Sequence, residues 1–399
     1  MLKNLKFALP LALLLASPAV AENAPGVTAT EIKVGGVFPF SGPASVIGLV
    51  GRGVLAYVQS VNDRGGINGR KINYIAYDDA YAPPKAVEHV RKLVEGDEVA
   101  FMFGQLGTPG NTAVAKYLIG KGVPAIGIVS GSNKFTNTTD YPLTTTSLVS
   151  FDTEGRIYAK YLNKTLPGKK YAILYQNDDL GKDYVNAFKA NMRDEFDKRV
   201  AVAAYEIADP TVDSQVVNLK ASGAEALLVA GTPKFAAQAI RKADEIGWKP
   251  LLIVNYPSSS VGGTLKPAGL DKSVGVVAGT MTKDPTDTKW DNDPGMKAFR
   301  VFVDKYMPGI DISDTNYIFG YTQGMILEQI IKQCGNDLSR ENILKQAKSL
   351  KDFVLPTVLP GIVINTSETV NQDYTQMRLQ RWTGTSWDQF SDVLDAKSE

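Results

Sequence analysis

Short apolar runs alternate with longer amphipathic stretches along most of the chain, and this alternation restricts the fold more than any other feature of the sequence. Runs rich in Val, Ile, Leu and aromatic residues predict strands at 32–40, 71–78, 99–105, 123–130, 170–178, 202–207, 225–231, 250–256 and 274–281. Apolar residues at a helical spacing predict helices between them, at 50–63, 83–96, 112–122, 154–165, 183–196, 213–223 and 236–247. Strands separated by helices are typical of parallel sheets with crossover helices, so we predict an α/β fold.

The alternation has an internal repeat. Residues 31–130 read as strand, helix, strand, helix, strand, helix, strand, and residues 170–256 repeat that order with unrelated residues. We therefore predict two Rossmann-like lobes with parallel sheets. The stretch 135–155 is polar and rich in Thr, which favours a crossing between the lobes over an element of either lobe. After residue 280 the pattern changes to a loop followed by two helices, at 299–307 and 321–334.

The first 21 residues have the composition of a secretory signal peptide. Lys3 and Lys6 precede the apolar stretch FALPLALLLA, and Ala19 and Ala21 provide the small residues of a cleavage site. This apolar stretch is too short to span a bilayer comfortably. No Cys lies near the cleavage site, so we expect a protein that is exported to the periplasm without a lipid anchor.

Composition excludes several classes of function. A formal net charge of +1 on 399 residues gives no reason to expect a nucleic acid or a membrane surface as partner. The single cysteine, Cys334, cannot form a disulfide within the chain, and with only one histidine, His89, a zinc site built from Cys and His is ruled out. We expect no metal and no cofactor.

Motifs of common enzyme classes are also missing. The sequence contains no G-x-S-x-G, no phosphate-binding G-x-x-x-x-G-K-[ST] and no G-x-G-x-x-G after a strand. The acid pairs Asp78-Asp79 and Asp178-Asp179 are expected to cap helices or to lie in solvent, because adjacent side chains on a strand or turn point apart. We therefore expect no catalytic residues.

Small and hydroxyl-bearing residues follow most of the predicted strands. They form the turns FPFSGPAS, FGQLGTPGNT, IVSGSNKF, YQNDDLGKD, VAGTPKF and VNYPSSSVGG. Ligands of open α/β sheets bind outside the carboxyl ends of the strands, where helix N-termini present N–H groups. Each turn alone is compatible with simple helix capping. Six of them at corresponding positions of two lobes favour a ligand cleft, to which Ser41 and Asp179 would contribute.

Several stretches resemble the Leu/Ile/Val-binding family of periplasmic solute-binding proteins. They are VGGVFPFSGPAS, VNDRGGINGRKINYIAYDDAYAPPKAVEHVRKLV, GQLGTPGNTAVAKYLIGKGVPAIG and AILYQNDDLGKDYVNAFK, and the similarity extends over residues 29–395. The resemblance implies a type I periplasmic binding protein whose two lobes are joined by a three-segment hinge. It also implies closure over a small solute that is delivered to an ABC permease in the inner membrane. Lobe 1 would comprise 26–147 plus 281–366, and lobe 2 would comprise 148–280 plus 367–399.

The same resemblance implies a set of ligand-binding residues. Amino-acid binders of the family hold the α-carboxylate with two turns, which match Leu106, Gly107 and Thr108 and Ser130, Gly131 and Ser132 here. They place an acidic residue for the α-ammonium where this sequence has Tyr256, followed by a proline and three serines with no carboxylate nearby. A further position that is often aromatic in the family falls at Thr232.

The missing acid changes the expected ligand. A buried ammonium without a partner costs several kcal/mol, so we expect a plain carboxylate, and an aromatic acid in preference to an amino acid. Candidate aromatic walls are Phe40, Tyr256, Phe319 and Tyr321. A branched-chain amino acid binder and a periplasmic sensor that passes its ligand-bound form to a membrane receptor remain alternatives. We expect the protein to act as a monomer.

Overall fold

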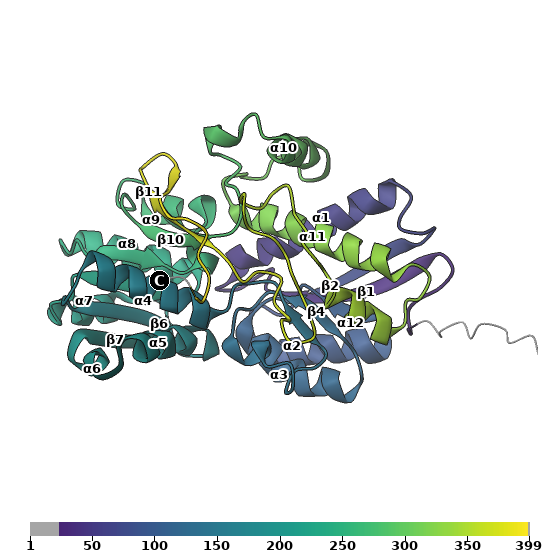
Figure 1. Ribbon diagram of the computed structural model, residues 1–399, viewed down its shortest axis with the longest axis horizontal. Coiled ribbons are helices and arrows are strands. Elements are labelled where there is room, and N and C mark those ends of the chain that lie inside the picture. The colour runs from purple at the N-terminus through teal and green to yellow at the C-terminus, as the bar shows by residue number, and fades with distance from the viewer. Residues whose placement is uncertain (1–23, 398–399) are drawn as a thin grey trace, which may run out of the picture.

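Two β-sheets organise residues 24–397, the part of the chain that the computed structural model describes. The predicted signal peptide at 1–21 lies outside these residues. The first sheet has the order β2-β1-β3-β4-β5 and is parallel throughout; its strands are β1 (Glu31–Phe38), β2 (Lys71–Asp78), β3 (Phe101–Phe103), β4 (Ala125–Ile128) and β5 (Thr144–Thr146). Figure 1 shows this sheet and its helices as one lobe, which we call lobe 1.

The second sheet repeats the same order and extends it. Its order is β12-β11-β10-β9-β8-β6-β7, and its strands are β6 (Tyr171–Gln176), β7 (Val200–Tyr205), β8 (Ala226–Ala230), β9 (Leu251–Val254), β10 (Val277–Thr280), β11 (Arg378–Trp382) and β12 (Trp387–Gln389). The strands β6 to β10 are parallel, whereas β11 pairs antiparallel with both β10 and β12. This sheet and its helices form lobe 2. The predicted α/β fold with two similar lobes is confirmed.

Helices cover both sheets, and many of them begin at a residue that caps the first turn. They are α1 (Ser45–Asp63), α2 (Pro83–Arg91), α3 (Thr108–Gly120), α4 (Phe151–Thr165), α5 (Asp179–Met192), α6 (Phe196–Arg199), α7 (Asp213–Ala221), α8 (Pro233–Glu245), α9 (Lys266–Ala268), α10 (Pro294–Tyr306), α11 (Thr315–Cys334) and α12 (Arg340–Ala347). Short 3₁₀ segments lie at Asn133–Thr136, Arg193–Glu195, Tyr256–Ser258 and Thr288–Trp290, and π-helical turns lie at Lys92–Gly96 and Val261–Leu265. The side chains of Ser150, Asp178 and Asp314 accept backbone N–H groups at the starts of α4, α5 and α11.

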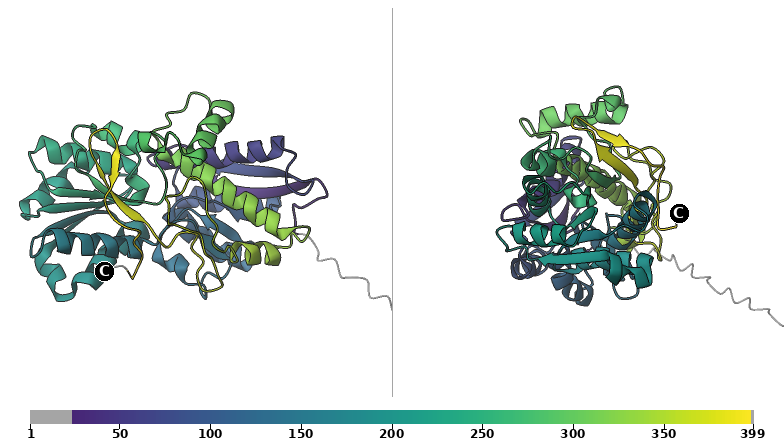
Figure 2. Two further views of the ribbon diagram at one scale, coloured as in Figure 1. Left: turned by 45° about the horizontal axis from the view of Figure 1, so that its top comes forward. Right: turned by 90° about the vertical axis from the view of Figure 1, so that its left-hand side faces the viewer.

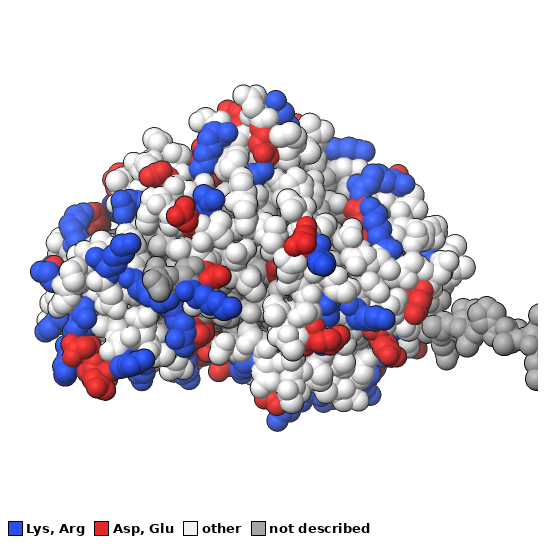
Figure 3. Space-filling view, viewed as in Figure 1, with Lys and Arg blue, Asp and Glu red and all other residues white. Residues whose placement is uncertain are grey.

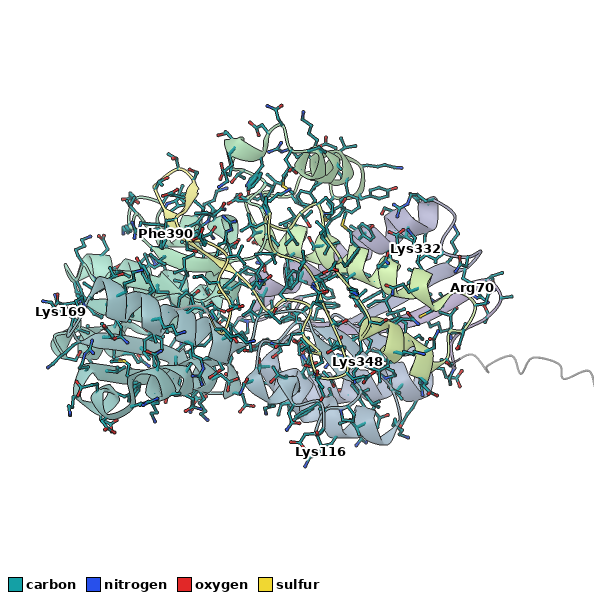
Figure 4. The ribbon with its side chains drawn as sticks, in the orientation of Figure 1. Arg70, Lys116, Lys169, Lys332, Lys348 and Phe390 are labelled. Carbon is teal, nitrogen blue, oxygen red and sulfur yellow. The ribbon has the colours of Figure 1, made fainter. Side chains whose placement is uncertain are left out.

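The chain passes between the two sheets three times. It leaves the first sheet after β5, returns after β10 to form α11, which packs along α1, and crosses again before β11. Figures 1 and 2 show this last segment, in yellow, running from lobe 1 to the edge of lobe 2. Lys348, labelled in Figure 4, anchors it in lobe 1 by donating to the Pro142 carbonyl at 2.8 Å and pairing with Glu368 at 3.3 Å.

The polar stretch 135–155 is more structured than expected. It contains β5, which joins the edge of the first sheet beside β4, and the start of α4. The chain crosses between the lobes after β5, as expected, but the expectation that the stretch contributes no element to either lobe is wrong. The sequence pattern concealed β5 because it consists of three threonines, Thr144 to Thr146, all of them buried.

Three further properties of residues 24–397 bear on function. No helix among them is long and apolar enough to cross a membrane. Within the same range, no group of His, Cys, Asp and Glu is arranged to hold a metal ion. On the face shown in Figure 3, basic and acidic side chains are intermixed over both lobes.

Candidate functional site

A small cavity lies between the two lobes, where the strands of both sheets end. In each sheet, the second strand along the chain lies on one side of the first strand and the third strand lies on the other side. Parallel α/β sheets bind ligands at such a switch in strand order. The residues that line the cavity are Ile47, Val50, Tyr81, Leu106, Gly107, Thr108, Val129, Leu148, Phe151, Leu180, Thr232, Tyr256, Pro257, Ser259, Ser260, Thr315, Asn316 and Phe319. None of these lining residues carries a charge. The wall is mainly apolar with several hydroxyls, as in many small-molecule sites.

Two of the predicted hydroxyls meet at the lobe 1 side of the cavity. Thr108 begins α3 and lines the cavity, and its Oγ1 lies 2.8 Å from Oγ of Ser130, which follows β4. Both side chains are buried, and the backbone N–H of Ser132 donates to Ser130 Oγ at 3.2 Å. The turns after β3 and β4 lie side by side because Leu106 bridges to Val129. Ser130 itself is not among the lining residues. Hydroxyl and N–H groups at a helix N-terminus are suited to donate hydrogen bonds to an anionic group.

Gly107 and Gly131 permit this close approach. Gly107, with φ of +110°, precedes α3 in a conformation that residues with a Cβ rarely adopt. A Cβ on Gly131 would lie 2.5 Å from the carbonyl oxygen of Val149 and 2.7 Å from the Phe151 ring. Gly131 itself is not among the lining residues.

Ser132 and Asp179 lie where the lobes touch, outside the lining residues. Ser132 Oγ donates to Asp183 Oδ2 at 2.9 Å, and the Asn133 N–H donates to the same oxygen at 2.8 Å. Asp179 pairs with Lys134. Burial raises the pKa of Asp183 to about 6. These contacts join the segment after β4 in lobe 1 to α5 in lobe 2, so we call them the α5 rim.

A second set of contacts joins the lobes at the start of α11. Ser260 Oγ donates to Asp314 Oδ1 at 2.9 Å, and the Gly262 N–H donates to the Ser313 carbonyl at 2.9 Å. Nearby, Lys266 pairs with Asp311 at 2.8 Å. With contacts at both this α11 rim and the α5 rim, the structure represents a closed arrangement of the lobes.

The lobe 2 wall contains two of the predicted residues and one that the sequence did not reveal. Tyr256 follows β9 and faces Phe319 of α11 with ring centroids 6.0 Å apart. Thr232 follows β8; its N–H donates to the Tyr205 hydroxyl at 3.1 Å, and its own buried Oγ1 has no hydrogen-bond partner among residues 24–397. Phe151, the first residue of α4, completes this wall.

A buried carboxylate lies beside Tyr256, and the expectation that none is nearby is wrong. Glu154 accepts hydrogen bonds from the Tyr256 N–H at 2.7 Å, the Tyr158 hydroxyl at 2.6 Å and the Tyr184 hydroxyl at 2.7 Å. Burial raises its pKa, and no basic residue within 24–397 pairs with it. Glu154 lies in the first turn of α4, about a hundred residues before Tyr256, so the sequence around Tyr256 could not show it. It is not among the lining residues.

Other predicted residues lie away from the cavity. Ser41 is exposed, and its N–H donates to Asp78 Oδ1 at 3.2 Å. The Phe40 ring packs on Phe38, with centroids 5.5 Å apart. Tyr321 packs on Tyr57, with centroids 5.1 Å apart. Lining residues that the sequence reasoning missed include Tyr81, Leu180, Ile47 and Asn316.

The two acid pairs have structural roles within the described residues. Asp178 caps α5, as predicted, by accepting the N–H groups of Leu180 and Gly181. Asp78 and Asp79 accept N–H groups in the turn after β2. Asp79 is buried, contrary to the expectation of a solvated side chain, and burial raises its pKa to about 6.

Comparison with known proteins gives consistent matches over nearly the whole chain. A family described as "Periplasmic binding protein" matches residues 31–386. A protein named "Leu/Ile/Val-binding protein homolog 7" from Brucella suis biovar 1 (strain 1330) is 24% identical over 388 residues, covering 94% of this chain and 93% of the relative.

Solved structures share the fold at low sequence identity. A branched-chain amino acid ABC transporter protein from Thermus thermophilus with bound valine has a TM-score of 0.82 at 14% identity, covering 92% of this chain and 97% of its own. A fatty acid ABC transporter substrate-binding protein from Thermomonospora curvata has a TM-score of 0.79 at 20% identity, covering 95% of this chain and 96% of its own.

Proposed function

The chain belongs to the periplasmic binding protein family, of the Leu/Ile/Val-binding type, and from this premise we propose that it is the solute-binding subunit of an ABC importer for a small carboxylate. The observation that carries the proposal is the cavity between the lobes, whose wall has hydroxyls and apolar side chains but no charged residue. A wall without a charged residue, histidine or cysteine suits reversible capture of a solute rather than acid–base or nucleophilic chemistry.

The ligand carboxylate would bind at the lobe 1 wall. Thr108 lines the cavity, so its hydroxyl would donate to the carboxylate with N–H groups of α3 beside it. Ser130, whose Oγ lies 2.8 Å from Thr108 Oγ1 but which is not a lining residue, would hold that hydroxyl in place. Charge-assisted hydrogen bonds of this kind contribute about 1.5 to 3 kcal/mol each. The ligand body would lie against Phe151, Tyr256 and Phe319, which favours an aromatic acid.

A branched-chain amino acid is the second candidate, and Glu154 is the observation that favours it. Its carboxylate lies 2.7 Å from the Tyr256 N–H, close to the position where the amino-acid binders of the resemblance hold the α-ammonium. The names of the relatives point to the same class of ligand. Against this candidate, Glu154 already accepts three hydrogen bonds and does not line the cavity.

The remaining parts of the proposal concern organisation and setting. We propose lobe boundaries at 26–147 plus 281–366 and at 148–280 plus 367–399, export to the periplasm by residues 1–21, a monomeric state and an inner-membrane ABC permease as partner. A sensor that presents its ligand-bound form to a membrane receptor would use the same cavity. Loss of solute uptake on deletion of the gene would favour the importer over the sensor.

The ligand class can be tested directly. Protein purified from its native periplasm is denatured and the released small molecules are identified by mass spectrometry. The protein is unfolded and refolded to remove bound ligand. Calorimetry then measures its affinity for benzoate, 4-hydroxybenzoate, octanoate, L-leucine and L-valine. Micromolar or tighter binding of an aromatic acid, with the amino acids silent, is expected. Binding of leucine or valine alone would overturn the aromatic-acid assignment and implicate Glu154.

A further inference from the structure

Four of the residues that line the cavity belong to one short segment after β9, residues 256–260, which we call the wall segment. They are Tyr256, Pro257, Ser259 and Ser260. The segment turns back on the Tyr256 carbonyl, which accepts the Ser259 N–H at 3.0 Å and the Ser259 hydroxyl at 2.8 Å. The position of the Tyr256 backbone therefore decides where a large part of the lobe 2 wall lies.

The β-sheet does not hold the Tyr256 N–H group. The ladder between β8 and β9 ends with Val229 opposite Val254, and the Asn255 N–H donates to the Val229 carbonyl at 3.2 Å. One residue further on, the Tyr256 N–H donates to Oε1 of Glu154 at 2.7 Å. A hydrogen bond to a carboxylate is about twice as strong as one between neutral groups. Glu154, on α4, thus anchors the first residue of the wall segment.

The Glu154 carboxylate is itself fixed in place. Its Oε1 also accepts the Tyr158 hydroxyl at 2.6 Å, and its Oε2 accepts the Tyr184 hydroxyl of α5 at 2.7 Å. The Tyr158 oxygen in turn accepts the Gly279 N–H of β10 at 2.7 Å. Glu154 and the two tyrosines are at most 1% exposed. The carboxylate therefore connects α4 with α5, with the end of β10 and with the wall segment, all of them within lobe 2.

These contacts leave Glu154 poorly suited to bind a ligand directly. A carboxylate has about four lone-pair sites, and three donors already occupy this one. Glu154 is not among the lining residues, whereas Tyr256, the residue that it anchors, is one of them. An effect of Glu154 on ligand binding would therefore be exerted through Tyr256.

We propose that Glu154 is a positioning residue for ligand binding, whose carboxylate holds Tyr256 so that its ring is in place before the ligand arrives. This inference rests on the proposed solute-binding function. A ligand that meets a preformed wall loses less affinity to the ordering of protein groups than one that must fix the wall itself. The group whose position is at stake is the Tyr256 ring, which faces Phe319 with centroids 6.0 Å apart.

The test measures the affinity of three Glu154 variants by calorimetry, with benzoate, 4-hydroxybenzoate, L-leucine and L-valine as ligands. Glu154→Leu removes the acceptor. Glu154→Asp withdraws it from Tyr256 by the length of a CH₂ group, keeps the charge, and serves if Glu154→Leu does not fold. Both should weaken binding of the best ligand about tenfold, because fixing one backbone residue on binding costs about that factor.

The conservative variant separates positioning from direct contact with the ligand. Glu154→Gln keeps an oxygen that can accept the Tyr256 N–H, so every ligand that binds wild type should bind it within about threefold. An ammonium partner would behave differently, because the amide lacks the charge. A loss of tenfold or more that is confined to leucine and valine in Glu154→Gln would overturn the inference.

The same substitution in lobe 1 provides a matched control. Glu328 also accepts a tyrosine hydroxyl, that of Tyr57 at 2.6 Å, and pairs with Arg64 at 3.0 Å, but it does not line the cavity. Glu328→Leu should lower stability in urea and leave ligand affinity within about twofold of wild type. Equal losses of affinity in Glu328→Leu and Glu154→Leu would reveal a general effect of stability, and would overturn the inference.

A double-variant cycle tests whether Glu154 acts through Tyr256. Affinity is measured for Glu154→Leu, Tyr256→Ala and the protein that carries both changes. Because Tyr256→Ala removes the ring that the carboxylate positions, Glu154→Leu should cost at most about threefold in that background, against about tenfold in wild type. Additive losses would show that Glu154 does not act through this ring, and would overturn the inference.

Amide hydrogen exchange distinguishes this inference from the proposed function, because it needs no ligand. If wild type binds none of the four ligands, the proposed ligand class fails, and exchange then tests the anchor. In Glu154→Leu and Glu154→Asp, the Tyr256 and Ser259 N–H groups should exchange about tenfold faster or more, while amides of β6 change no more than in Glu328→Leu. Unchanged exchange at Tyr256 and Ser259 would overturn the inference.

Discussion

Replacement of Thr108 by alanine removes the one hydroxyl of the Thr108–Ser130 pair that lines the cavity. The Thr108 side chain is buried, and its Oγ1 lies 2.8 Å from Ser130 Oγ, which fixes the position of the hydroxyl. A hydrogen bond to a charged ligand group contributes about 1.5 to 3 kcal/mol, and about 1.4 kcal/mol corresponds to tenfold in affinity. We therefore expect Thr108→Ala to weaken binding of the best ligand by about 10- to 100-fold.

The effect on folding should be much smaller, which separates the two roles of the hydroxyl. Ser130 Oγ retains the Ser132 N–H at 3.2 Å when Thr108 is truncated. The free energy of unfolding should fall by only about 1 kcal/mol, the usual net value of one neutral hydrogen bond.

Calorimetry measures affinity and urea unfolding measures stability in the same preparations. Thr108→Ser keeps the hydroxyl and should bind within a few fold of wild type, and Thr139→Ala, at an exposed threonine, is the matched control. A Thr108→Ala protein that binds within twofold of wild type would refute the assignment of this hydroxyl to the ligand.

Three further outcomes are expected. N-terminal sequencing of the mature protein should begin at Glu22, because cleavage is predicted after Ala21; another start would contradict the assigned signal peptide. Small-angle scattering should show a decrease in radius of gyration on ligand binding. Closure buries Asp183 and raises its pKa to about 6, so the closed form should gain stability as pH falls from 7 to 5. Asp183→Asn should remove that pH dependence, and a dependence that persists would show that another group causes it. Burial raises the pKa of Asp373 from 3.8 to about 8. The folded protein should therefore lose stability progressively as pH rises between these two values, and this loss should level off above pH 8. The difference in unfolding free energy between Asp373→Asn and wild type should therefore grow between pH 5 and 8 in urea titrations, and a constant difference would contradict the assigned protonation.

The sequence predicted the strands whose burial makes them continuous apolar runs. β6 and β8 are examples, since nearly every residue in them is buried between helices. It failed for β5, which is only three threonines long, and for β11, where Arg378 and Arg381 flank the buried residues Leu379 and Gln380. Strands of this kind owe their place to pairing with neighbours that are distant in the chain, which a local pattern cannot show.

Most of the candidate site that could be predicted follows a strand, and the aromatic wall residue Phe319 on α11 is the exception. Thr108, Thr232 and Tyr256 lie in turns after β3, β8 and β9, and all three line the cavity. Phe151 and Leu180 were missed because helix residues that face a cavity have the same apolar character as helix residues that face a core. The position of Glu154 depends on the approach of α4 to β9, which is a property of the tertiary structure alone.

The pairing of β11 with β10 has a consequence for the order of folding. β10 ends at Thr280, but its outer neighbour begins only at Arg378, so almost a hundred residues must emerge before the second sheet acquires its last two strands. During synthesis the edge of β10 would lack its partner, and native contacts that span long sequence separations form slowly. Lobe 2 can therefore reach its native state only late in the production of the chain. For a polypeptide exported in an unfolded form, such a delay would keep it competent for translocation.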